Sequence, residues 1–120
     1  MWLDNNQITG TIPTEIALLT DLASLSMAEM DLVGTIPSEV GNSLSRLRRA
    51  WLYNNKLVGT IPKNFNQLSF LEVFEIHGNE ITGYMPQDVC TFISSSLYEF
   101  KSLTSDCVSE IVCDCCTVCY

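Results

Sequence analysis

The sequence contains no long apolar run and few positively charged residues. No apolar stretch approaches the roughly 18 residues that a membrane-spanning helix requires, so no such helix is predicted. Lys and Arg number 6 against 14 Asp and Glu, which gives a formal net charge of −8. This excess of acidic residues argues against nucleic acids and anionic membranes as partners, because both are bound through Lys and Arg.

Known catalytic motifs are also absent. The sequence has no G-x-G-x-x-G loop, no H-E-x-x-H motif and no G-x-S-x-G turn. His77, the single histidine, stands two residues after Glu75 and could act as a base or a pH switch. No serine or cysteine nucleophile accompanies it in a recognisable motif. We therefore expect no enzymatic activity, no cofactor and no metal, and an exposed His77 whose hydrogen bonds are satisfied.

Glycine and proline recur three positions apart along the chain. The pattern occupies residues 10–13, 34–37, 59–62 and 83–86, with glycines separated by 24, 25 and 24 residues. A fixed period in the twenties is typical of a solenoid, in which each repeat buries its apolar face only against its neighbours. Function is then expected on a surface and not in a closed pocket.

Alignment on the glycines gives the consensus L-x-x-L-x-L-x-x-N-x-L-x-G-x-I-P, with Asn6, Asn55 and Asn79 as structural asparagines. This pattern resembles the leucine-rich repeat family, and its G-x-I-P end resembles the plant-type class. The resemblance implies an α/β solenoid, a right-handed superhelix with a parallel sheet on its concave face. About four repeats are expected over residues 1–89.

Each repeat is predicted to supply one short strand to that sheet. Apolar residues two positions apart, such as Leu25 and Met27, indicate a strand with one buried face. The asparagine amide, which both donates and accepts, can bond the backbone of the turn that leaves the strand. After each proline, apolar residues three or four positions apart predict a short helix on the convex side.

Met30 stands where the other repeats carry asparagine. The second coil should therefore lack the side-chain bonds to its own turn, and an unpaired buried amide costs about 1–3 kcal/mol. We expect the weakest turn of the array between Met30 and Gly34.

All six cysteines lie in the last 31 residues, which predicts a separate cap over residues 90–120. The end of a solenoid needs a cap, and a short cap with little core of its own needs disulfides. Residues 90–100 predict a helix, and residues 103–107 a last strand. The adjacent Cys115 and Cys116 should pair with different partners, although four closely spaced thiols could instead hold zinc or another soft metal. The cysteines are Cys90, Cys107, Cys113, Cys115, Cys116 and Cys119.

Side chains between the core positions of each strand are expected on the concave face. Trp2 and Trp51 stand two rungs apart, about 10 Å by the spacing of stacked strands, with Ser26 and Ala28 between them. This predicts a notch with aromatic walls and a low floor, although aromatics also simply favour strands. Aromatic residues and arginine often anchor recognition surfaces. The candidate ligand-binding residues are Trp2, Ser26, Ala28, Arg49, Trp51, Tyr53, Glu75 and His77.

Arg46, Arg48 and Arg49 form a basic cluster in an otherwise acidic sequence. With few other bases, the cluster favours local ion pairs over a site for a polyanion. Arg48 and Glu72 occupy equivalent places on neighbouring rungs. We expect them to form a surface ion pair worth about 0–1 kcal/mol.

The late cysteines resemble the carboxyl-terminal caps of extracellular plant and microalgal leucine-rich repeat proteins. The resemblance implies a non-catalytic recognition module that binds a protein, peptide or glycan on its concave surface, without direct membrane insertion. Disulfides imply an oxidising compartment, hence a secreted or cell-surface protein. Because the sequence opens inside a repeat without a signal peptide, we expect the C-terminal part of a larger receptor-like or inhibitor-like protein. The alternatives are an assembly module that stacks through its amino-terminal end on further repeats or a second copy, and a ligand-sensing fragment of a receptor kinase.

Overall fold

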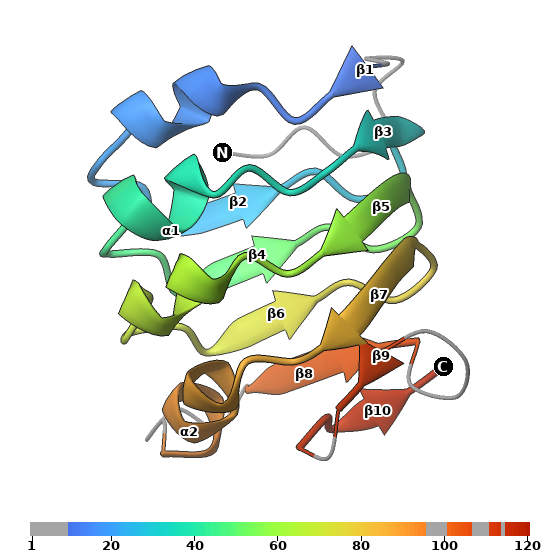
Figure 1. Ribbon diagram of the computed structural model, residues 1–120. Helices are drawn as coiled ribbons and strands as arrows, with labels where there is room; N and C mark the ends of the chain where they lie inside the picture. Colours follow the sequence, from blue (N-terminus) through green and yellow to red (C-terminus); the bar gives the residue numbers. More distant parts are fainter. Residues whose placement is uncertain (1–9, 96–100, 107–110, 114) are drawn as a thin grey trace.

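Parallel strands stacked at one per repeat form the concave sheet of a right-handed solenoid (Figure 1). The computed structural model describes residues 10–95, 101–106, 111–113 and 115–120. In the described chain this sheet has five strands, and the cap continues it without a change of direction. From the cap toward the amino terminus they are β10 (Val118–Cys119), β8 (Ser102–Ser105), β6 (Val73–Glu75), β4 (Arg49–Trp51) and β2 (Ser24–Ser26).

A second parallel sheet runs along the side of the coils, and the sequence analysis did not predict it. It forms where each coil leaves its turn and passes through the repeated glycine. Gly34, Gly59 and Gly83 have φ angles of 79°, 82° and 93°, a region that side chains with a Cβ rarely adopt. The strands are β1 (Gly10–Thr11), β3 (Leu32–Gly34), β5 (Lys56–Thr60), β7 (Glu80–Tyr84) and β9 (Ile111–Val112).

Short helices follow the prolines and cover the convex side, as predicted (Figure 1). They are η1 (Thr14–Leu18), α1 (Glu39–Ser43) and η2 (Lys63–Gln67). The fourth proline leads into the longer α2 (Gln87–Ser95), which begins three residues before the predicted helix; residues 96–100 lie outside the described part. This helix runs across the predicted boundary between residues 89 and 90. The division into repeats over residues 1–89 and a cap over residues 90–120 therefore stays a prediction.

The core is built from rows of equivalent residues, one from each coil. Leu44 and Leu68 are both 0% exposed, and each fully buried leucine contributes about 1.5–3 kcal/mol. Phe65 and Phe74, whose ring centroids lie 5.6 Å apart, fill the space between helix and strand. The equivalent Leu19 is 46% exposed, because it lies in the first described coil. The core therefore depends on stacking and not on any coil alone.

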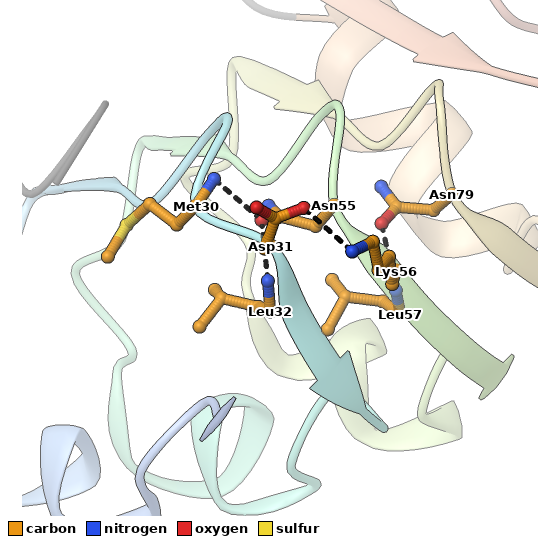
Figure 2. Close-up of polar contacts among 7 residues, drawn as sticks. All are labelled: Met30, Asp31, Leu32, Asn55, Lys56, Leu57 and Asn79. Atoms are coloured by element: carbon orange, nitrogen blue, oxygen red, sulfur yellow. Dashed lines mark hydrogen bonds and ion pairs between the residues drawn. The ribbon is translucent and has the colours of Figure 1, made fainter. Parts of the chain in front are cut away.

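Two asparagine side chains, Asn55 and Asn79, each join their coil to the coil before it (Figure 2). Asn55 Oδ1 accepts hydrogen bonds from the N–H groups of Met30 and Leu32 at 2.9 and 3.0 Å. Asn55 Nδ2 donates to the carbonyls of Met27 and Leu52 at 2.8 and 3.0 Å. One buried amide thus satisfies the turns of two successive coils.

Asn79 and Asp106 continue this asparagine ladder toward the cap. Asn79 Oδ1 accepts from Leu57 N–H at 3.1 Å, and its Nδ2 donates to the carbonyl of Leu52 at 2.9 Å. The Asp106 carboxylate accepts from the N–H groups of Gly78 and Asn79 at 3.0 and 3.1 Å. A carboxylate has no donor, so Asp106 can close the ladder but cannot bond carbonyls as the amides do.

That the weakest turn lies between Met30 and Gly34 stays a prediction, but the expectation that the second coil lacks side-chain bonds to its turn is wrong. Its turn does receive side-chain bonds, because Asn55 on the next coil supplies them. Met30 itself is 2% exposed and packs as a core residue. The missing amide therefore leaves the Met30 turn intact. Asn6, the first predicted asparagine, lies outside the described residues.

Disulfides fasten the cap. Cys90 on α2 pairs with Cys115, and Cys113 pairs with Cys116, so the adjacent cysteines have different partners, as predicted. Cys119 is also in a disulfide, whereas Cys107 lies outside the described residues. These bonds occupy the thiols that the alternative metal site requires. Cys90–Cys115 closes a loop of 25 residues and Cys113–Cys116 a loop of only 3. Because a longer loop loses more chain entropy in the unfolded state when it is closed, we expect the first disulfide to contribute about 3–4 kcal/mol and the second about 2 kcal/mol.

Substitution Asn55→Ala should lower the free energy of unfolding by about 3 kcal/mol, because it removes partners from buried N–H and carbonyl groups on two coils. Urea denaturation measures this loss, and amide hydrogen exchange should quicken at Met30 and Leu32. The control Asn66→Ala, at an exposed position of η2, should change stability by less than about 0.5 kcal/mol. Unchanged exchange at Met30 in the Asn55 variant would contradict the ladder.

Candidate functional site

The register of the concave sheet lines up the candidate residues in rows. Ser26 pairs with Trp51, Trp51 with Glu75, and Glu75 with Thr104. Because side chains alternate along a strand, these residues share one face with those two positions away. Arg49 precedes Trp51 in this way and pairs with Val73. The register brings Arg49, Trp51, Tyr53, Glu75 and His77 together on one patch, the concave patch.

Aromatic rings stack across the concave patch from coil to coil. The Tyr53 and His77 rings are 5.0 Å apart between centroids and nearly parallel, with an interplanar angle of 2°. The Tyr120 ring lies on His77 at 3.9 Å and 18°. Tyr120 was not among the predicted ligand-binding residues. The one signal for it in the sequence was an aromatic residue in the cap. The cap therefore contributes a ring to the concave patch.

The backbone of the cap explains why Tyr120 reaches His77. Tyr120 follows β10, and its N–H donates to the carbonyl of Ser105 at 2.9 Å. Asp106 follows the intervening strand β8, but its carboxylate turns into the asparagine ladder. The Asp106 carboxylate thus does not compete with the Tyr120 ring for space on the concave side of the sheet. The Tyr120 side chain is 58% exposed.

His77 is satisfied, as predicted, but it is half-buried and not exposed. A hydrogen bond of 2.7 Å joins its Nδ1 to Thr104 Oγ1, and rings cover it on both sides. Thr104 is only 3% exposed, so its hydroxyl is closed to a substrate. This geometry fixes the imidazole as part of a ring stack.

The predicted notch has no open floor. Ser26 and Ala28 are 2% and 1% exposed, so neither presents an open surface to a ligand. Trp51, Tyr53 and Glu75 are half-buried and Arg49 is exposed. Trp2, the other predicted wall, lies outside the described residues. The patch open to a partner therefore runs from Arg49 to Tyr120.

The basic cluster forms local ion pairs, and one of them is more buried than expected. Arg48 Nη1 lies 3.0 Å from Glu72 Oε1, with the two side chains 40% and 4% exposed. Its guanidinium also lies 6.0 Å from the Phe70 ring centroid. Arg46 pairs with Asp21 at 3.1 Å, with both side chains exposed. The Arg48 pair is therefore structural, and its buried carboxylate depends on it.

A separate hollow of about 810 Å³ opens between the second sheet and the convex helices, lined by residues such as Thr35, Pro37 and Thr60. Its single charged lining residue is Glu39, and no aromatic ring lines it. The concave patch offers more of the side chains that anchor partners.

Comparison with known proteins agrees with this architecture. The Leucine Rich Repeat family model matches residues 46–68. The plant peptide hormone receptor RGFR1, solved in complex with RGF2, superposes with a TM-score of 0.72 and 38% identity, covering 77% of this chain and 15% of that chain. The chain belongs to the leucine-rich repeat family.

Other structures similar to this leucine-rich repeat chain are also receptor ectodomains. That of the receptor kinase SOBIR1 from Arabidopsis thaliana has a TM-score of 0.71 and 32% identity, covering 77% of this chain and 50% of that chain. That of the Arabidopsis receptor kinase HAESA, solved with an IDA peptide hormone ligand, has a TM-score of 0.68 and 28% identity, covering 72% and 14%. The chain thus spans half or less of these relatives.

A search of curated proteins found no significant match. In the described part of this leucine-rich repeat chain, no helix has the length and hydropathy needed to cross a membrane.

Substitution Arg48→Ala should lower the free energy of unfolding by about 2–3 kcal/mol, because it leaves the buried Glu72 carboxylate without its cation. The matched control Arg46→Ala breaks an exposed pair and should cost about 0–1 kcal/mol. Thermal or urea denaturation of both variants checks the difference. Equal losses would show that the Glu72 carboxylate does not depend on Arg48.

Proposed function

We propose that this protein is a non-catalytic recognition module that binds a peptide or an extended segment of a protein on its concave patch. The observation that carries the proposal is the stack of Tyr53, His77 and Tyr120 beside the half-buried Trp51. Aromatic rings held in place by packing lose little entropy when a partner binds, and they dominate many interfaces.

The similar structures support a peptide as the partner. RGFR1 was solved with RGF2 and HAESA with a peptide hormone ligand. A glycan remains an alternative partner of the same patch, since aromatic rings also suit sugars. The cap over residues 90–120 then serves the repeats of residues 1–89 in two ways: it closes their core and completes the aromatic row.

We further propose that the protein is secreted or exposed at the cell surface, as part of a larger receptor-like or inhibitor-like protein. The disulfides Cys90–Cys115 and Cys113–Cys116 require an oxidising compartment to persist. The ectodomains of receptor kinases to which the chain is similar support the same location.

Substitution Trp51→Ala should weaken peptide binding about 30-fold or more, the loss typical of an aromatic hot spot. The ligands are peptides selected on the wild-type protein from a displayed library of random peptides, and their affinities are measured by calorimetry. Tyr84→Ala is the control. Because Tyr84 is 76% exposed on the other sheet, its removal should leave the peptide affinity unchanged. Selected peptides that bind the Trp51 variant unchanged would overturn the concave patch as the site.

A second candidate function is assembly through the first described coil. Leu18 and Leu19 are 79% and 46% exposed, whereas the leucines equivalent to Leu19 on the next two coils are 0% exposed. An exposed core row of this kind suits another leucine-rich coil, and we propose a second copy of this chain as its occupant.

If copies stack in this way, sedimentation at rising protein concentration should show dimers, and Leu19→Glu should abolish them. The control Tyr84→Glu introduces a charge at an exposed position of β7, away from the first described coil, and should leave the dimers intact. At a protein concentration near 1 mM, sedimentation detects an association free energy of only about 4 kcal/mol. A wild-type protein that stays monomeric at this concentration would exclude the stacking candidate.

A further inference from the structure

We propose that Glu75 receives a cationic side chain, arginine or lysine, from the peptide partner. This inference rests on the proposed binding at the concave patch and adds the chemistry of one contact. In the sheet register Glu75 lies between Trp51 and Thr104, and His77 follows two positions along the same strand. The carboxylate therefore lies on the same face as the Trp51 and His77 rings, which a bound partner would contact.

The Glu75 carboxylate is half-buried, and in the described part of the chain no hydrogen bond or ion pair engages it. Four of the six Lys and Arg residues are engaged elsewhere. Arg46, Arg48 and Lys56 pair with Asp21, Glu72 and Asp31, and Lys101 donates to a carbonyl in α2. A partially desolvated carboxylate without a partner favours a ligand that brings the missing charge.

The charge of the whole molecule favours a cation at this place. The net charge of −8 draws cationic partners toward the molecule. An acidic peptide would meet repulsion, and a neutral glycan offers hydroxyl donors but no positive charge to the carboxylate.

Arg49 is the basic residue of the concave patch. It lies exposed on β4 opposite Val73, one row away from Glu75, and forms no ion pair with Glu75 in the described chain. The Glu75 carboxylate is therefore open to a cation that the partner supplies.

The test uses peptides selected on the wild-type protein from a displayed library of random 12-residue peptides. They should be enriched in arginine or lysine over the library, and Glu75→Gln should weaken them about tenfold, the value of a charge-assisted hydrogen bond. Replacing the peptide cation by glutamine should have the same effect, and the two changes together should cost little more than either alone. Glu80→Gln, the matched loss of an exposed charge on β7, should change affinity less than about twofold.

Equal weakening by Glu75→Gln and Glu80→Gln would overturn the inference, since it would show only the attraction of the net charge. Selected peptides that lack cations but still require Trp51 would overturn the inference and leave the proposed function standing. Peptides that bind regardless of both Trp51→Ala and Glu75→Gln would overturn the proposed function itself. Thermal denaturation verifies that each variant is folded.

Discussion

Hydrogen bonds from one coil to the coil before it hold this solenoid together. The turns that leave the concave sheet bury backbone N–H groups such as those of Met30, Leu32 and Leu57, which need partners within the protein. Asn55 and Asn79, 7% and 8% exposed, reach back and supply these partners. Asp106 ends the series with a carboxylate that accepts but cannot donate. Every coil beyond the first described one therefore depends on its neighbour for both its core and its turn.

The same register decides what the concave surface looks like. Because equivalent residues of successive coils are paired in the sheet, their side chains lie directly above one another, and the Tyr53 and His77 rings become nearly parallel. The cap extends the sheet through β8 and β10 and brings Tyr120 onto His77. A cap that closes the core is thus also part of the concave patch.

Charge follows a similar division between structure and surface. Arg48 and Glu72, which precede the neighbouring strands β4 and β6, form a pair in which the carboxylate is almost fully buried. Glu75 is one rung from Trp51 and is left without an intramolecular cation in the described chain. The first charge is satisfied by folding, and the second is available to a partner.

The sequence by itself determined the period, the apolar rows, the strands of the concave sheet, the helices after the prolines and the separate partners of Cys115 and Cys116. These features follow from spacing within one repeat or from the chemistry of neighbouring residues. Only the tertiary structure decided the direction of the asparagine bonds, the second sheet, the burial of Ser26, Ala28 and Glu72, and the place of Tyr120. The physical reason is that these depend on neighbours in space that the chain brings together from afar, such as Met30 and Asn55, 25 residues apart. A repeat pattern states which residues are equivalent, but packing decides which of them meet.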